Sequence, residues 1–547
     1  MMAFPVGNVT PRVVLHGKNG TYEGVVNNVM NLTRNKMGIR SATLTGATLK
    51  NLYLIAAAEA NDGVDFTNYK DANTGYVPLN NADVIAMLAK VKSIDVNGKN
   101  DPTVCDEIGY FPNLTELSCS NNRLTTLDVS KNLLLTTLDC RKNNLTSLNV
   151  SNNKAWTILV CNNNTNLASL DVSNNKALWI LDCENGKLKT LNVSNNLKLA
   201  SLNCSHNALT ALDVSNNASL LILNSSYNSL SSLDITNNEL LAEFYCSNNA
   251  LGSLDVSKNG NLYKLDCSHN SLKKLDFSNN AILEELNCDF NSLSSLNVTK
   301  NPKLTKLRCL SNQLKTLNVA NNTELTDLNC SMNSLTALDI TNNKKIKVLS
   351  CSDNLIKTLT ITGSDLEYLY CRNNELVEFS LNVVGKLIRS IDFSGCKKLK
   401  KLSIADEAEY YSTGYTTQFS SLNVDGCTAL EELTCHGTAI TKLDITTCTA
   451  LKELHCYFNR LNNGLDVSKN TQLTLLECFH NNMSSLDITA CPNLNLNNVF
   501  CGNRSTQCTL WVTESQNDSG FLINTPCYLQ NVEYGNVNDN VTVKVKN

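Results

Sequence analysis

The sequence is poor in proline, glycine, aromatic residues and net charge. Its 547 residues include only 8 prolines and 23 glycines, and aromatic side chains make up 6%. The 46 lysines and arginines nearly balance the 50 aspartates and glutamates, which leaves a net charge of −4. A charge this small gives no general attraction to DNA, RNA or anionic membranes. We therefore expect no nucleic-acid partner.

Long apolar runs are also missing. No stretch of 18 consecutive apolar residues occurs, so the sequence predicts no membrane-spanning helix and no membrane insertion. The first residues, Met1 to Gly7, lack a basic region followed by an apolar one, and we expect no ordinary signal peptide there. The apolar content of 42% is nonetheless enough to build a core, which excludes wholesale disorder.

A repeat of about 21 residues dominates what is present. Cysteines recur at steps of 20 to 22 residues from Cys119 to Cys371, with Ser225 in one slot, and they reappear in the same phase from Cys435 to Cys501. A second phrase, Leu-Asp-Val-Ser-x-Asn, lies midway between the cysteines, so each unit contains two nested half-repeats. Self-similarity at this period indicates stacked coils rather than a series of globules.

Each half-repeat predicts one short strand. Leu117 and Cys119 alternate with Ser118 and Ser120, so the apolar pair points inward and the polar pair points outward. A single coil cannot bury its leucine, cysteine and valine, whereas stacking joins these positions into a continuous core. The sequence therefore predicts a mainly β protein with little helix, in which residues 96–501 form a solenoid of short parallel strands.

The unit L-x-x-L-x-C-x-x-N-x-L resembles the leucine-rich repeat, in the short nested form of 21 residues known from bacterial proteins of the surface type. The resemblance covers residues 96–501. It implies a non-enzymatic recognition or adhesion scaffold that lies outside the cell or on its surface and binds a protein or a glycan. By the same resemblance, the asparagines at two slots form ladders that satisfy backbone groups in the turns. Cysteine replaces asparagine in one ladder at Cys396, Cys427, Cys448 and Cys491.

The 23 cysteines predict small buried apolar side chains. Neighbouring parallel strands hold equivalent side chains farther apart than a disulfide allows, and no Cys-x-x-Cys pair supplies the spacing of a zinc site. Cys508 and Cys527 stay open as an exception, since both lie outside the repeat.

Four parts of the chain follow from where the repeat begins and ends. Residues 1–45 carry no repeat and are a candidate attachment region through which an assembly partner would bind. Residues 46–95 predict a small mixed α/β cap, with helices over residues 52–60 and 82–88. The solenoid of residues 96–501 is interrupted by an insertion near residues 406–418. Residues 502–547 alternate in polarity without the leucine coils and predict a β cap.

Eight residues are candidates for binding, because aromatic and histidine side chains on an outward face favour recognition. Three tyrosines lie in the insertion, and the other five occupy outward strand positions that hold Ser, Asp or Asn in earlier coils. These five are expected to form one exposed patch across three coils, unless the inserted loop covers that edge. The candidates are Tyr410, Tyr411, Tyr415, His436, His455, Tyr457, Glu477 and Phe479.

Catalysis has no support in the residue pattern. No nucleophile–base–acid cluster, glycine-rich phosphate loop or paired carboxylates are evident, so we expect no enzyme, no cofactor and no metal. An alternative to the surface scaffold is a structural appendage of a virion or secretion particle. In that case residues 1–45 would anchor the chain to the particle and the repeats would face the host.

Overall fold

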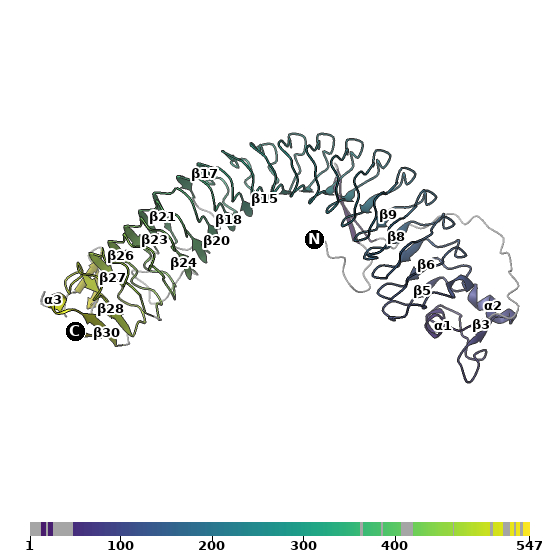
Figure 1. Ribbon diagram of the computed structural model, residues 1–547, viewed down its shortest axis with the longest axis horizontal. Coiled ribbons are helices and arrows are strands. Elements are labelled where there is room, and N and C mark those ends of the chain that lie inside the picture. Colours follow the sequence, from purple (N-terminus) through teal and green to yellow (C-terminus); the bar gives the residue numbers. More distant parts are fainter. Residues whose placement is uncertain are drawn as a thin grey trace. The chain divides into compact units, whose positions relative to one another are not determined.

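The computed structural model describes residues 12–17, 20–25, 48–361, 365–383, 387–405, 419–462, 464–503, 507–517, 526–529, 532–536 and 540–546. The chain forms two units, Met1–Leu283 and Glu284–Asn547, and Figure 1 shows the strands of both. No helix of the described part combines the length and apolarity needed to cross a bilayer.

The first unit begins with two hairpins and two helices. Strands β1 (Arg12–Gly17) and β2 (Gly20–Val25) pair antiparallel, as do β3 (Thr48–Leu49) and β4 (Val77–Pro78). Helices α1 (Leu52–Glu59) and α2 (Ala82–Leu88) confirm the predicted pair. Each helix begins where an asparagine, Asn51 or Asn81, accepts backbone N–H groups of the first turn. These elements form the mixed α/β cap expected before the repeat.

A run of parallel three-residue strands follows in the first unit, one strand to each coil. Leucine pairs with leucine along the run, for example Leu117 with Leu138, because each coil repeats the phase of the last. The strands are β5 (Ser93–Asp95), β6 (Glu116–Ser118), β7 (Thr137–Asp139), β8 (Ile158–Val160), β9 (Ile180–Asp182), β10 (Ser201–Asn203), β11 (Ile222–Asn224), β12 (Glu243–Tyr245) and β13 (Lys264–Asp266).

The second unit contains two runs of parallel strands. The first run comprises β14 (Glu285–Asn287), β15 (Lys306–Arg308), β16 (Asp327–Asn329), β18 (Val348–Ser350), β20 (Tyr368–Tyr370), β22 (Ser390–Asp392) and β24 (Ser421–Asn423). The second run comprises β21 (Glu378–Asn382), β23 (Lys401–Ala405), β25 (Glu432–Thr434), β26 (Glu453–His455), β27 (Leu475–Glu477) and β29 (Val499–Phe500). A further pair is β17 (Ala337–Asp339) with β19 (Thr358–Thr360).

The predicted solenoid core is confirmed. Leucine and cysteine of each strand point inward and are buried, as at Leu138 and Cys140, both of which are 0% exposed. The 22 cysteines whose side chains are described are all buried and free; Cys527 is not among them, so its pairing with Cys508 stays untested. The aspartates of the second half-repeat face outward, and Asp213 accepts the backbone N–H of Ser215 at 2.9 Å.

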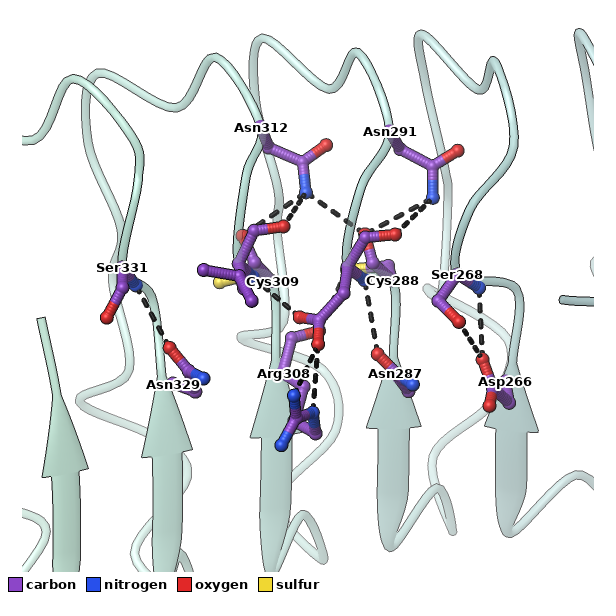
Figure 2. Close-up of polar contacts among 12 residues, drawn as sticks. Asp266, Ser268, Asn287, Cys288, Asn291, Arg308, Cys309, Asn312, Asn329 and Ser331 are labelled. Carbon is purple, nitrogen blue, oxygen red and sulfur yellow. Dashed lines mark hydrogen bonds and ion pairs between the residues drawn. The ribbon is translucent and has the colours of Figure 1, made fainter. Parts of the chain in front are cut away.

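Both asparagine ladders are present. In the first, Nδ2 of Asn312 donates to the carbonyl oxygens of Cys288 and Cys309 at 3.0 and 3.2 Å (Figure 2). In the second, Nδ2 of Asn322 donates to the carbonyl oxygens of Val298 and Asn301 at 2.9 and 2.8 Å. Each amide therefore joins its own coil or the next turn to the coil before, where the backbone turns away from the sheet and cannot pair with itself.

Cysteine takes over the donor role where it replaces asparagine, as predicted. The thiol of Cys427 donates to the carbonyl oxygen of Phe393 at 3.2 Å, and that of Cys448 donates to the carbonyl oxygen of Val424 at 3.4 Å. Cys396 and Cys491 make the same bond, each at 3.3 Å. A thiol is a weaker donor than an amide, so this part of the ladder is held by weaker hydrogen bonds.

The two kinds of half-repeat exchange sheets within the second unit, which corrects the expectation that the later cysteines resume in the same phase. Up to β20, the cysteine strands belong to the first run, and β22 and β24, of the Leu-Asp-Val kind, continue that run. The cysteine strands β25 to β27 belong instead to the run that begins with β21. Figure 1 shows β17, β21, β23 and β26 along one edge and β15, β18, β20 and β24 along the other.

An additional half-repeat causes this exchange. Successive half-repeats alternate between the two edges, but β21 and β22 are both of the Leu-Asp-Val kind and follow each other directly. Ile404 occupies the next cysteine slot, is fully buried and lies 33 residues after Cys371, which is one and a half repeats. Every later half-repeat therefore falls on the opposite edge from its earlier counterpart.

The C-terminal part forms the expected β cap. Strands β28 (Ser485–Asp487), β30 (Cys508–Val512) and β33 (Val541–Val545) pair parallel, and β31 (Pro526–Leu529) pairs antiparallel with β32 (Val532–Asn536). A short helix, α3 (Glu514–Asn517), was not predicted. Its Gln516 donates to the carbonyl oxygens of Ile488 and Cys491 at 3.0 and 2.8 Å, so an amide ends the ladder as it began.

Candidate functional site

The candidate site lies on the outward face of the β21–β29 run. One row of outward side chains alternates in charge, and the ammonium of Lys401 lies 2.9 Å from the carboxylate of Glu432. The next row holds Thr434, His455 and Glu477 in register on β25, β26 and β27. Short strands that present one residue of each row per coil therefore assemble a continuous polar face from residues about 21 apart in sequence.

His455 and Glu477 form the centre of this face. Nδ1 of His455 lies 2.7 Å from Oε2 of Glu477, and both side chains are 21% exposed. Burial lowers the pKa of His455, but the hydrogen bond and charge of Glu477, together with the charges of Glu453 and Glu432, raise it above its ordinary value of 6.5. The pair can therefore present a cationic ring held between carboxylates at mildly acidic pH.

Replacing Glu477 by glutamine should lower the pKa of His455. The substitution keeps the shape of the side chain but removes the nearest negative charge, so burial weighs more heavily against the charged ring. The pKa is read from the pH dependence of the His455 ring signals in NMR spectra. Glu239→Gln, an exposed change in the first unit, is the control; an unchanged pKa in Glu477→Gln would refute the pairing.

Three of the predicted site residues do not form the expected exposed patch. His436, Tyr457 and Phe479 are only 8%, 3% and 1% exposed. Their rings stack in a column, with centroids 4.4 Å apart between His436 and Tyr457 and 4.7 Å apart between Tyr457 and Phe479, both pairs within 6° of parallel. Burial, with a smaller effect of His455, lowers the pKa of His436 to about 4, so this ring is neutral at pH 7.

The error comes from treating the residue after each cysteine as a strand position. The strand has already ended there and the backbone turns, so the slot is buried in other coils too, as at Ser205 (1%) and Ser268 (4%). The following residue adopts the left-handed conformation, with φ of 51° at Phe458 and 54° at His480. Phe458 packs edge-on against Phe479, with centroids 5.6 Å apart, and completes an aromatic cluster beneath the polar face.

The remaining candidates, Tyr410, Tyr411 and Tyr415, lie outside the described residues. Of the eight candidates, the structure brings His455 and Glu477 together at the surface and places His436, Tyr457 and Phe479 beneath them. No group of three His, Cys, Asp or Glu side chains within the described ranges is arranged to hold a metal ion.

A buried carboxyl on the outward face of the first unit was not predicted. Asp182 pairs in register with Val160 and Asn203 on the neighbouring strands and is only 6% exposed. Its Oδ1 accepts the backbone N–H of Glu184 at 3.2 Å. Burial raises the pKa of Asp182 to about 7. The sequence gave the outward position of Asp182 but no sign that its neighbours cover it.

Replacing Asp182 by asparagine should stabilise the protein at pH 8 but not at pH 4. The native carboxyl holds its proton more tightly than the unfolded one, so its contribution to stability is complete at pH 4 and is lost as the pH rises to about 7. Asparagine mimics the protonated form, and the gain at pH 8 should be about 2–4 kcal/mol. Urea unfolding at both pH values measures it. Asp213→Asn, at an exposed position, should give no such gain, and an equal effect of Asp182→Asn at both pH values would contradict the assignment.

Comparisons with known proteins identify similar solved structures. No family model matches the sequence, and no curated protein does. The functional domain of InlJ from Listeria monocytogenes, described as including a cysteine ladder, is 27% identical over 86% of this chain and 83% of that chain, with a TM-score of 0.40. The LRR protein LIC12759 from Leptospira interrogans is 20% identical over 69% and 93%, with a TM-score of 0.47. A TDR receptor is 18% identical over 78% and 91%, with a TM-score of 0.50.

The repeat and the structure agree on the fold. Each coil of about 21 residues carries the predicted inward leucine, the predicted parallel strand and the predicted ladder side chain. The chain is therefore a leucine-rich-repeat protein of the short nested kind, similar to proteins of that fold from bacteria.

Proposed function

We propose that the protein is a non-enzymatic recognition scaffold that binds a protein or a glycan outside the cell or at a cell surface. The observation that carries this proposal is a contrast between the two sides of each strand. The middle residue of the strand hardly varies and is buried in every coil, whereas its two neighbours face outward and change from coil to coil.

The strands β15, β18 and β20 illustrate the contrast. Their middle residues Leu307, Leu349 and Leu369 are all 0% exposed. The outward pairs are lysine with arginine on β15, valine with serine on β18, and two tyrosines on β20. A fixed core under a varied face suits binding through many side chains, because contacts can differ along the face without disturbing the fold.

Binding assays with the full chain test this proposal. The protein is screened on a glycan array and on a panel of purified cell-surface proteins, and each positive is repeated with two variants. One variant replaces His455 and Glu477 by alanine on the β21–β29 face, and the other replaces Lys306 and Asp327 by alanine on the β14–β24 face. Asp213→Ala, at an exposed position away from both faces, is the control.

We expect one face variant to weaken binding at least tenfold while the control leaves it unchanged. A chain that binds nothing in either screen, or binding that both face variants leave intact, would refute the proposal. The alternative of a particle appendage depends on residues 1–45, which lie largely outside the described residues. Co-purification of the chain with assembled particles would favour that alternative.

A further inference from the structure

A hollow interrupts the outward face of the second unit at the carboxyl ends of β16, β18 and β20. Its volume is about 260 Å³, and Asn329, Met332, Ser350, Asp353, Tyr370 and Arg372 are among the side chains that line it. It belongs to the β14–β24 run and not to the β21–β29 run that carries His455 and Glu477.

The hollow arises from a change in side-chain size between adjacent strands. Ser350 of β18 pairs in register with Asn329 on one side and with Tyr370 on the other, so a short side chain lies beside a large ring. Tyr370 is 38% exposed, and its ring is parallel to that of Tyr368 on the same strand within 4°. Met332 is 49% exposed and supplies an apolar side chain to the lining.

Polar groups at the rim are held in place yet remain accessible. The guanidinium of Arg372 lies 3.4 Å from the carboxylate of Asp353, and these side chains are 55% and 31% exposed. Nδ2 of Asn373 donates to Oδ1 of Asp353 at 2.7 Å. Oδ1 of Asn329 accepts the backbone N–H of Ser331 at 3.1 Å (Figure 2), which orients the amide and points its NH2 group away from that bond. The rim therefore offers both donors and acceptors.

Size and charge restrict what the hollow can hold. Pockets for drug-sized ligands measure about 300–1,000 Å³, so this smaller space suits a single ring. The one guanidinium is already paired with Asp353, and Asp392 adds a second carboxylate to the lining, so there is no excess of positive charge for an anion. The strands β16, β18 and β20 are hydrogen-bonded on both sides and offer no free edge for an added peptide strand.

We propose that this hollow binds the pyranose ring of a neutral sugar, with the ring against Tyr370 and its hydroxyl groups at Asn329, Ser350 and the Asp353–Arg372 pair. A pyranose has an apolar face that packs on an aromatic ring, and hydroxyls that both donate and accept. Because the hollow is open, the sugar is one residue of a larger glycan. This inference rests on the proposed recognition function and assigns it a ligand class and a site.

Saturation-transfer NMR with the full chain tests the assignment. The probes are the methyl glycosides of glucose, galactose, mannose and N-acetylglucosamine. Tyr370→Ala removes the aromatic platform, and Ser350→Leu fills the hollow from an outward position. Tyr368→Ala is the matched control, since it removes an equal ring from the same strand outside the hollow. Circular dichroism spectra establish that each variant is folded.

We expect at least one glycoside to bind, with affinity at least tenfold lower in Tyr370→Ala and Ser350→Leu and within about twofold of the parent in Tyr368→Ala, since stacking on one aromatic ring carries this much. Absence of transfer from every glycoside, or equal transfer in all three variants, would overturn the assignment. If the chain binds a panel protein but no glycoside, the sugar site is wrong and the scaffold role stands. If it binds neither, both are wrong.

Discussion

Asn322→Ala should lower the free energy of unfolding by about 2–4 kcal/mol, and Asn322→Asp should lower it further. Asn322 is fully buried, and its Nδ2 donates to two carbonyl oxygens of the preceding coil. Its Oδ1 accepts no hydrogen bond within the described part of the chain. The amide nitrogen is therefore the stabilising atom, and alanine leaves two buried carbonyls without it.

Asn322→Asp is the sharper variant because it preserves the shape of the side chain. It replaces a donor by an oxygen that faces two carbonyl oxygens, so like partial charges meet in a buried site. Asn321 provides the matched control: it is adjacent and exposed, and its Nδ2 makes one hydrogen bond of 3.1 Å to Thr299. Asn321→Asp should change stability by less than about 1 kcal/mol.

Chemical unfolding and hydrogen exchange measure the two substitutions together. Because each coil contacts only its neighbours, the loss should appear first as faster exchange of backbone amides in the coils around Asn322. Equal effects of Asn322→Asp and Asn321→Asp would show that the ladder does not hold adjacent coils together.

Phe479→Ala should lower the free energy of unfolding by about 3–5 kcal/mol, as removal of a buried aromatic side chain does. Phe479 is 1% exposed, stacks on Tyr457 and meets Phe458 edge-on. Its loss opens a cavity beneath the polar face and also removes the stacking contact. Urea unfolding of the parent and the variant gives the difference.

The control for Phe479→Ala is Leu387→Ala, in which an apolar side chain that is 47% exposed is removed from the same unit. Its effect should stay below about 1 kcal/mol. If Phe479→Ala is as mild as Leu387→Ala but weakens ligand binding, then Phe479 lies at the surface, as the sequence alone suggested.

The sequence predicted the coil correctly because one pattern is repeated many times. Leucine and cysteine at a spacing of two can be buried together only on one side of a strand, and the period of 21 aligns those sides between coils. The caps followed from the places where the pattern stops, and the helices followed from their asparagine N-caps and apolar content.

The exchange of half-repeats was not predicted because both kinds are apolar at the same spacing. Ile391 and Phe393 fit either slot, and only the distance of 33 residues from Cys371 to Ile404 reveals that a half-repeat has been added. The candidate site was predicted in part. His455 and Glu477 lie where the period-two rule places them, whereas His436, Tyr457 and Phe479 follow the end of a strand, where that rule no longer applies.

Titration of the cysteines with a thiol reagent tests the central claim most directly, namely that successive coils bury leucine and cysteine in one continuous core. The reduced native protein should react with no more than one equivalent, since the 22 cysteines with described side chains are all buried. After unfolding in guanidinium chloride, all 23 should react. Rapid reaction of several thiols in the native protein would contradict the shared core.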